Sequence, residues 1–147
     1  MKQVNKSVLL WYSAREMFDL VTAVPQYPQF LPWCERTEIL EQDEAGMSAR
    51  LHLAYMGVRH SFTTRNTHDL GRRVDIRLLD GPFSLLEGTW QFNSLGNKDD
   101  ACKVEFDLRY EFSSAAFSAL VSPVFDRIAN TFIESFVARA QAVYGPR

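Results

Sequence analysis

The chain has 147 residues and few side-chain sets that could do chemistry. Its histidines, His52, His60 and His68, are eight residues apart and would share strand parity, but no Asp or Glu shares that spacing. We therefore predict solvent-exposed histidines and no metal site. Cys34 and Cys102 stand alone, which predicts reduced, partly buried thiols. Because no nucleophile motif, HExxH motif or glycine-rich phosphate loop occurs, we predict no catalytic residue.

Charged residues are segregated along the chain. Residues 35–44 contain five acids and one base, whereas residues 59–77 contain five arginines and two acids. The basic segment is a candidate docking surface for an anionic membrane or ribosomal RNA, or it forms exposed cross-strand ion pairs. Its arginines are Arg59, Arg65, Arg72, Arg73 and Arg77. Because the formal net charge is only -2, we expect no DNA partner.

Aromatic residues make up 13% of the chain, which is a high share for a domain of this size. Alternating apolar positions and a terminal helical stripe place most of them on inward faces, where they either fill a core or line an apolar pocket. Buried Tyr55 and Tyr110 hydroxyls need a partner, which is a ligand head group, a backbone carbonyl or water. The inward set that we predict to line a cavity is Leu53, Tyr55, Phe62, Leu86, Trp90, Phe106, Tyr110, Val121, Phe125, Ile128 and Phe132.

The elements that must position these residues begin with a strand over residues 3–12. Ser13 followed by Glu16 forms a capping-box pattern, so a helix begins there and ends by Pro25. Three prolines between residues 25 and 32 predict one short helical turn. Glycines every ten to fifteen residues then predict about six antiparallel strands between residues 35 and 112. Gly88, inside a strand, predicts a bulge or bend.

A long amphipathic helix is predicted from Ala115 to Tyr144, ended by Gly145. Pro123 should kink this helix or mark its true start. The element order predicts a single α+β domain over residues 1–147, with one curved antiparallel sheet of about seven strands around the final helix. We expect a cytoplasmic protein, free or peripheral to the inner membrane face, because neither a signal core nor a span of about 18 apolar residues occurs.

A family resemblance rests on three features: the segment YPQFLPWC over residues 27–34, the helix that begins after Ser13, and the terminal amphipathic helix. Together they resemble the START-like (SRPBCC, helix-grip) superfamily, and most of all its polyketide cyclase/coenzyme Q-binding branch, which includes ribosome-association toxins. The resemblance implies a deep apolar cavity between sheet and helix. It also implies a cavity mouth at Phe30, Pro32 and Trp33, for which a hydrophobic plug is the alternative.

Three functions are consistent with this resemblance. The leading hypothesis is a non-enzymatic protein that binds a hydrophobic small molecule, ubiquinone or a related isoprenoid lipid, and supports respiration without a cofactor or metal. The alternative is a toxin that inhibits ribosomal subunit association through the basic segment, with the ribosome as partner. A polyketide cyclase or aromatase is third, since Arg59 and Arg65 have strand parity opposite to Phe62 and should point outward.

Overall fold

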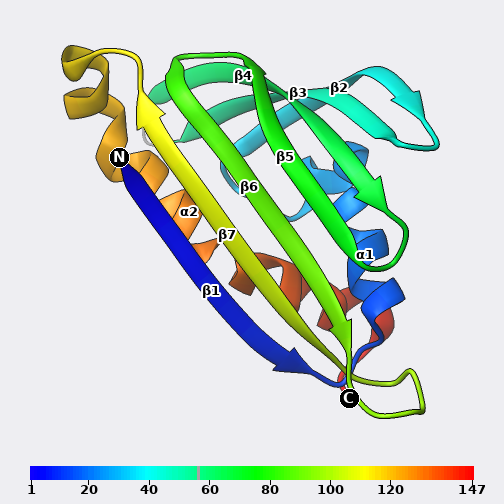
Figure 1. Cartoon of the computed structure of the whole chain (residues 1–147). Coiled ribbons are helices and arrows are strands. Elements are labelled where there is room, and N and C mark those ends of the chain that lie inside the picture. The colour runs from blue at the N-terminus through cyan, green and yellow to red at the C-terminus, as the bar shows by residue number, and fades with distance from the viewer. Residues whose placement is uncertain (56) are drawn as a thin grey trace.

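The computed structural model describes residues 1–55 and 57–147. Its described strands form one seven-stranded antiparallel sheet in the order β1-β7-β6-β5-β4-β3-β2, with a long helix along one face (Figure 1). This architecture confirms the predicted α+β helix-grip fold. The strands are β1 (Lys2–Leu10), β2 (Cys34–Asp43), β3 (Gly46–Tyr55), β4 (Val58–Asp69), β5 (Arg73–Asp80), β6 (Phe83–Ser94) and β7 (Cys102–Phe112).

The first helix begins where the capping box predicts. In α1 (Ala14–Thr22), the Glu16 backbone N–H donates to Ser13 Oγ at 3.0 Å, and the Ser13 N–H donates to Glu16 Oε1 at 2.9 Å. The predicted short helical turn is the 3-10 helix η1 (Val24–Gln29). The first strand ends at Leu10, before the predicted residue 12, because Tyr12 turns inward and donates its hydroxyl to the Gly145 carbonyl at 2.7 Å.

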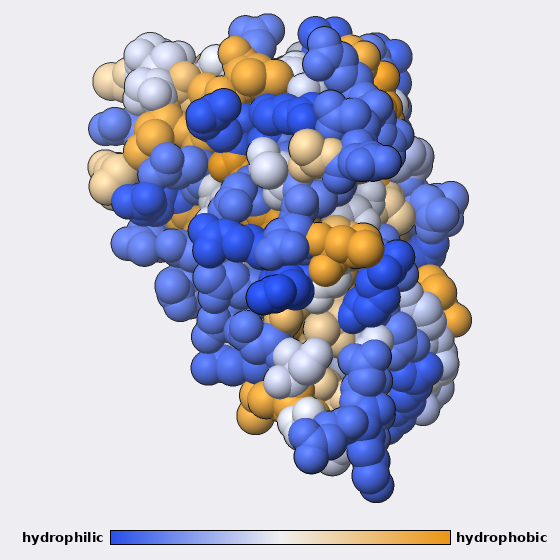
Figure 2. Space-filling view, turned by 45° about the vertical axis from the view of Figure 1, so that its right-hand side comes forward, coloured by the Kyte–Doolittle hydropathy of each residue, from blue (hydrophilic) through white to orange (hydrophobic). Residues whose placement is uncertain are grey.

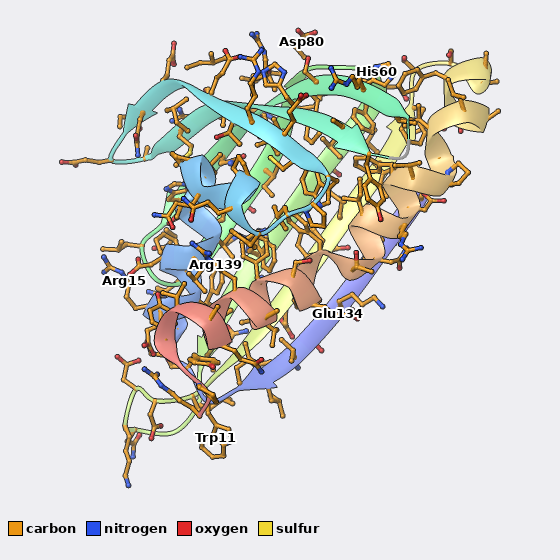
Figure 3. All side chains as sticks on the ribbon, turned by 180° about the vertical axis from the view of Figure 1, so that it is seen from behind. Trp11, Arg15, His60, Asp80, Glu134 and Arg139 are labelled. Atoms are coloured by element: carbon orange, nitrogen blue, oxygen red, sulfur yellow. The ribbon has the colours of Figure 1, made fainter. Side chains whose placement is uncertain are left out.

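The terminal helix α2 (Ala115–Tyr144) has the predicted bounds. Ser114 caps it by accepting the Phe117 N–H at 3.0 Å. Pro123 lies inside the helix and does not mark its start. Figure 3 shows the helix changing direction between its first turns and its longer part, as expected where a proline removes a backbone hydrogen bond. Among the described residues, no helix combines the length and hydropathy needed to cross a membrane.

Of the bulge or bend predicted at Gly88, the bulge is wrong. Gly88 pairs in unbroken register with Ile76 on one side and Leu108 on the other. A Cβ at this position would lie 3.0 Å from the Asp107 carbonyl oxygen and 3.1 Å from Leu108 Cδ1. The absence of a side chain at Gly88 therefore allows β7 to lie close to β6, and no bulge forms.

Register shifts occur elsewhere in the sheet. Edge strand β2 carries two against β3, and β4 carries one against β5. A further shift separates Phe83 from Leu85, where β6 pairs with β7. These irregularities bend strands and increase local twist, which helps a sheet to wrap around a helix. The resulting concave face packs against α2.

Aromatic rings fill most of the space between the concave face and α2. The Trp90 ring centroid lies 4.5 Å from that of Phe106 and 5.3 Å from that of Phe136. Phe132 lies 5.5 Å from Phe106 and 5.1 Å from Phe136. Offset and edge-on pairs at such distances add attraction beyond the burial of apolar area. The hydrophobic core is therefore an aromatic cluster that joins sheet and helix.

Candidate functional site

A cavity of about 80 Å³ remains between the concave face, η1 and α2. All but three of its lining side chains are hydrophobic or aromatic. Pockets for drug-sized ligands measure roughly 300 to 1,000 Å³, whereas a single water needs only about 10 to 15 Å³. In this conformation the cavity thus has room for a small molecule or a head group.

The structure brings together part of the predicted lining. Side chains from β4, β6, β7 and α2 meet there, together with Trp33 from the segment after η1. The predicted residues that line the cavity are Trp33, Phe62, Leu86, Trp90, Phe106, Phe125, Ile128 and Phe132. Outside the lining lie Phe30, Pro32, Leu53, Tyr55, Tyr110 and Val121. Leu53 and Val121 are buried in the core, and Pro32 is exposed.

Tyr110 uses its hydroxyl within the protein and not toward a ligand. The hydroxyl donates to Asp126 Oδ1, while Lys2 and Ser122 donate to Asp126 Oδ2. Burial and the adjacent carboxylate raise the pKa of Tyr110. Burial also acts to raise the pKa of Asp126, but hydrogen bonds from Lys2, Tyr110 and Ser122 outweigh it and lower that pKa. This network ties the start of β1 and the end of β7 to α2.

Three polar residues on β4 were missed as cavity residues. Thr64, Asn66 and His68 alternate along the strand in phase with Phe62 and line the same cavity. The Thr64 hydroxyl donates to Asn66 Oδ1 at 2.8 Å. That period-two alternation with Phe62 is the sequence signal that could have revealed them.

The prediction of an exposed His68 is wrong. Its ring packs edge-on to Phe18 with centroids 5.8 Å apart, and its Nε2 is buried without a hydrogen-bond partner in the described residues. Burial lowers the pKa of His68, and the nearby positive charge of Arg65 lowers it further. The imidazole is therefore neutral near pH 7.

The other two histidines lie apart from His68 and from each other. His52 Nε2 is 2.8 Å from Glu38 Oε1, and the His60 ring stacks edge-on against Phe117 at 4.4 Å. The expected shared parity holds for His60 and His68, which are both on β4, but fails for His52. Because β3 and β4 pair His52 with Ser61, His52 and His60 point to opposite faces of the sheet. In the part of the chain that the structure describes, no group of three His, Cys, Asp or Glu could hold a metal ion.

The segment around η1 lines the cavity and is held against α2. Trp33 is buried, and its ring centroid lies 5.9 Å from that of Phe132. From α2, Arg139 Nη2 donates to the side-chain oxygens of Gln26 at 3.1 Å and Gln29 at 3.0 Å. The same guanidinium lies 5.0 Å from the centroid of the Phe30 ring. Figure 3 shows Arg139 between α2 and η1, where it holds this segment against the helix.

The arginines of the basic segment lie among acids rather than in a purely positive patch. Arg59 is 3.3 Å from Glu35, and Arg65 is 3.3 Å from Asp43. Charges that are separated in the sequence are thus mixed on the outer face of the sheet. Further pairs join Arg73 to Asp75 at 2.9 Å and Arg72 to Asp69 at 4.0 Å, while Arg77 is paired in register with Arg65 and Glu87.

Exposed pairs of this kind contribute little to stability. Arg59 and Arg72 remain accessible, whereas the Arg65 side chain is only 22% exposed. Arg59 and Arg65 are on the face opposite to Phe62, as their parity predicts, so neither is a cavity residue. Figure 2, an oblique view of the sheet side, shows mainly hydrophilic side chains with hydrophobic ones in small, separate patches.

A curved antiparallel sheet that grips one long helix over an apolar cavity defines a helix-grip protein of the START-like class. The chain belongs to the family described as polyketide cyclase/dehydrase and lipid transport, whose model matches residues 10–137. A START superfamily protein from Mycobacterium smegmatis has the same fold, with a TM-score of 0.79 and 21% identity over 96% of this chain and 98% of that one.

Curated relatives narrow the similarity within the family. The ribosome association toxin RatA of Pseudomonas aeruginosa is 42% identical over 142 residues, which are 97% of this chain and 97% of the toxin. The mitochondrial coenzyme Q-binding protein COQ10 homolog B of Xenopus laevis is 28% identical over 97% of this chain but only 59% of its own length. The resemblance seen in the sequence is thereby confirmed, and the toxin is the nearer of these two relatives.

Proposed function

We propose that this protein is a ribosome-association toxin that opposes the joining of ribosomal subunits. The observation that carries the proposal is the 42% identity to the Pseudomonas aeruginosa toxin over 97% of both chains. This ranks the ribosomal function above the ubiquinone-binding function that we expected to lead. The protein then acts in the cytoplasm, where its partner is.

The outer face of the sheet, together with the adjoining β4–β5 turn that carries Arg72, is the surface that we assign to ribosomal RNA. The side chains of Arg59 and Arg72 are 77% and 76% exposed, and their acidic partners are exposed as well. Because ion pairs in water are weak, RNA phosphates can replace the carboxylates as partners of the guanidinium groups. The contact would weaken as salt is added, since phosphate binding releases counterions.

Sedimentation profiles test this assignment. Excess wild-type protein should raise free subunits at the expense of joined ribosomes, and the double variant Arg72→Glu, Arg73→Glu should lose that effect. Arg127→Glu is the matched control, because Arg127 is exposed on α2, away from the sheet's outer face. An unchanged subunit ratio with wild-type protein would refute the function. If the double variant raises free subunits as much as wild-type protein does, the assignment of this surface to ribosomal RNA is refuted.

We further propose that the protein binds and does not catalyse. The titratable groups in the cavity lining are the His68 imidazole and the Tyr27 phenol, whose hydroxyl donates to the Val21 carbonyl. An acid–base pair aimed at a substrate would need a second free group. Turnover of a poly-β-keto substrate by the purified protein would contradict this proposal and support a cyclase.

A second function, binding of an uncharged hydrophobic molecule such as ubiquinone, is favoured by the apolar cavity and by the similarity to the coenzyme Q-binding protein. Burial of apolar area would provide the affinity, at about 25 cal/mol per Å² before ordering costs. Binding of this kind requires no metal or nucleotide. Solvent extraction of purified protein with mass spectrometry should detect a co-purifying lipid or quinone, whereas its repeated absence and a lack of saturable quinone binding would exclude this function.

A further inference from the structure

We propose that Thr64, Asn66 and His68 form a hydrogen-bonding subsite for the uncharged polar head, a hydroxyl or a carbonyl, of a small ligand with an apolar body. The proposal rests on the ligand-binding function given above and is independent of the ribosome. It assigns an orientation to the ligand: the polar end lies at β4, and the apolar body lies against the aromatic rings of β6, β7 and α2.

The placement of the three residues supports one shared subsite. They occupy alternate positions of a single strand, so their side chains project from the same face at intervals of about 6.6 Å. The Thr64 hydroxyl is used in its bond to Asn66 Oδ1, which fixes the orientation of the amide. The Asn66 NH₂ group is then the free donor of this pair, since no acceptor for it occurs among the described residues.

His68 supplies the second polar group. Its Nε2 is shielded from solvent and has no partner in the described part of the chain, whereas buried polar atoms are nearly always hydrogen-bonded. A neutral imidazole offers one donor and one acceptor, so it can bond to either a hydroxyl or a carbonyl. His68 therefore brings an unpaired nitrogen to the cavity wall, and a ligand atom can complete its bonding once the ring turns toward the cavity.

The rest of the wall determines the chemical class of the ligand. Among the described residues, no Lys, Arg, Asp or Glu lines the cavity, so a carboxylate, phosphate or ammonium head would be buried without a counter-charge. At about 80 Å³ the present space suits one ring or a short chain. A longer body would require the η1 segment to move, and Arg139 is the side chain that joins that segment to α2.

Phenol and toluene are the matched probes, because they differ only in a hydroxyl against a methyl group. Dissociation constants for both are measured by nuclear magnetic resonance titration of wild-type protein and of variants. The ratio of the toluene constant to the phenol constant should fall about three- to tenfold in His68→Phe and in Asn66→Leu, as expected for one lost hydrogen bond. Toluene binding itself should stay nearly unchanged.

His60→Phe is the matched control, because it makes the same substitution on β4 at an exposed site outside the cavity lining. It should leave the ratio unchanged. If His68→Phe does not fold, as judged by circular dichroism, Asn66→Leu carries the test. Unchanged ratios in the folded variants would overturn the subsite while leaving ligand binding intact. If wild-type protein binds neither phenol nor toluene, both the subsite and the ligand-binding function are overturned.

Discussion

The two faces of the sheet are built from the same strands but by different physical chemistry. On β4, the concave face carries Phe62, Asn66 and His68, and the outer face carries Arg59 and Arg65. Strand alternation thus separates a cavity wall from a charged surface by one residue. Substitutions at Phe62, Asn66 and His68 should affect ligand binding, and substitutions at Arg59 and Arg65 should affect docking.

The faces also differ in how much they stabilise the fold. A buried aromatic side chain removes a large apolar area from water, whereas an exposed ion pair contributes about 0.2 to 1 kcal/mol at most. Stability therefore comes mainly from the concave face and α2. The outer face is free to carry charges for a partner, because the fold does not depend on any one of its pairs.

The largest expected effect is the loss of the central ring on the concave face. Trp90 is 1% exposed and contacts the rings of Phe106, Phe132 and Phe136. Trp90→Ala should lower the free energy of unfolding by about 3 to 5 kcal/mol, measured by urea denaturation. Gln91→Ala, the next residue but on the outer face, should change it by less than about 0.5 kcal/mol. Similar losses in both variants would refute the contrast between the faces.

A smaller effect is expected from the network at the end of the concave face. Tyr110→Phe removes the hydroxyl that donates to Asp126 and should cost about 1 to 2 kcal/mol of unfolding free energy. Tyr55→Phe is the control, since the described residues offer its hydroxyl no hydrogen-bond partner. Tyr110→Phe should leave the dissociation constants of phenol and toluene unchanged. If this variant loses the preference for phenol, the Tyr110 hydroxyl does contact the ligand.

The partly buried imidazole of His68 should make the stability of the protein depend on pH. Its pKa is lowered in the folded protein by burial and by Arg65, so the unfolded chain binds more protons as the pH falls toward the folded pKa. The stability of wild-type protein should decrease as the pH falls from about 7.5 to about 5.5, through the unfolded pKa of about 6.5. The His68→Phe variant lacks this titrating group. The melting temperature of the variant minus that of wild-type protein should therefore increase as the pH falls over this range. If the difference between the two melting temperatures does not change with pH, the pKa of His68 is not lowered in the folded protein.

The smallest effect is expected for the ion pairs of the outer face. Exchanging the charges of one pair, as Glu35→Arg with Arg59→Glu, keeps opposite charges together. The exchange should change the free energy of unfolding by less than about 0.5 kcal/mol in a urea titration. A loss above about 2 kcal/mol would show that the outer face contributes to stability and that the comparison drawn here is wrong.

Local patterns in the sequence predicted most of the fold. The capping box located the start of α1, and apolar periodicity gave the bounds of α2. Gly88 was misinterpreted because a glycine permits close approach as readily as a bulge, and only the neighbouring strand decides between them. The end of the first strand was missed for a similar reason, since the partner of Tyr12 is the carbonyl of Gly145, far along the chain.

The site was harder to predict because it depends on register between strands. Parity along β4 places Phe62 and Arg65 on the correct faces, but the sequence analysis predicts an exposed His68 and assigns no role to Thr64 or Asn66. The sequence analysis places Tyr110 in the cavity lining and does not predict its partner, because sequence alone does not show that Asp126 of α2 faces its hydroxyl. The mixing of acidic and basic segments also required knowledge of the strand order.

The position of the acidic segment has one further consequence. It lies largely on β2, an edge strand of the sheet, whose unpaired backbone groups could recruit a strand from a second molecule. Two register shifts distort this strand, and exposed carboxylates follow one another along it. Like charges would meet if two copies joined edge to edge, so this margin protects the protein against aggregation at high expression.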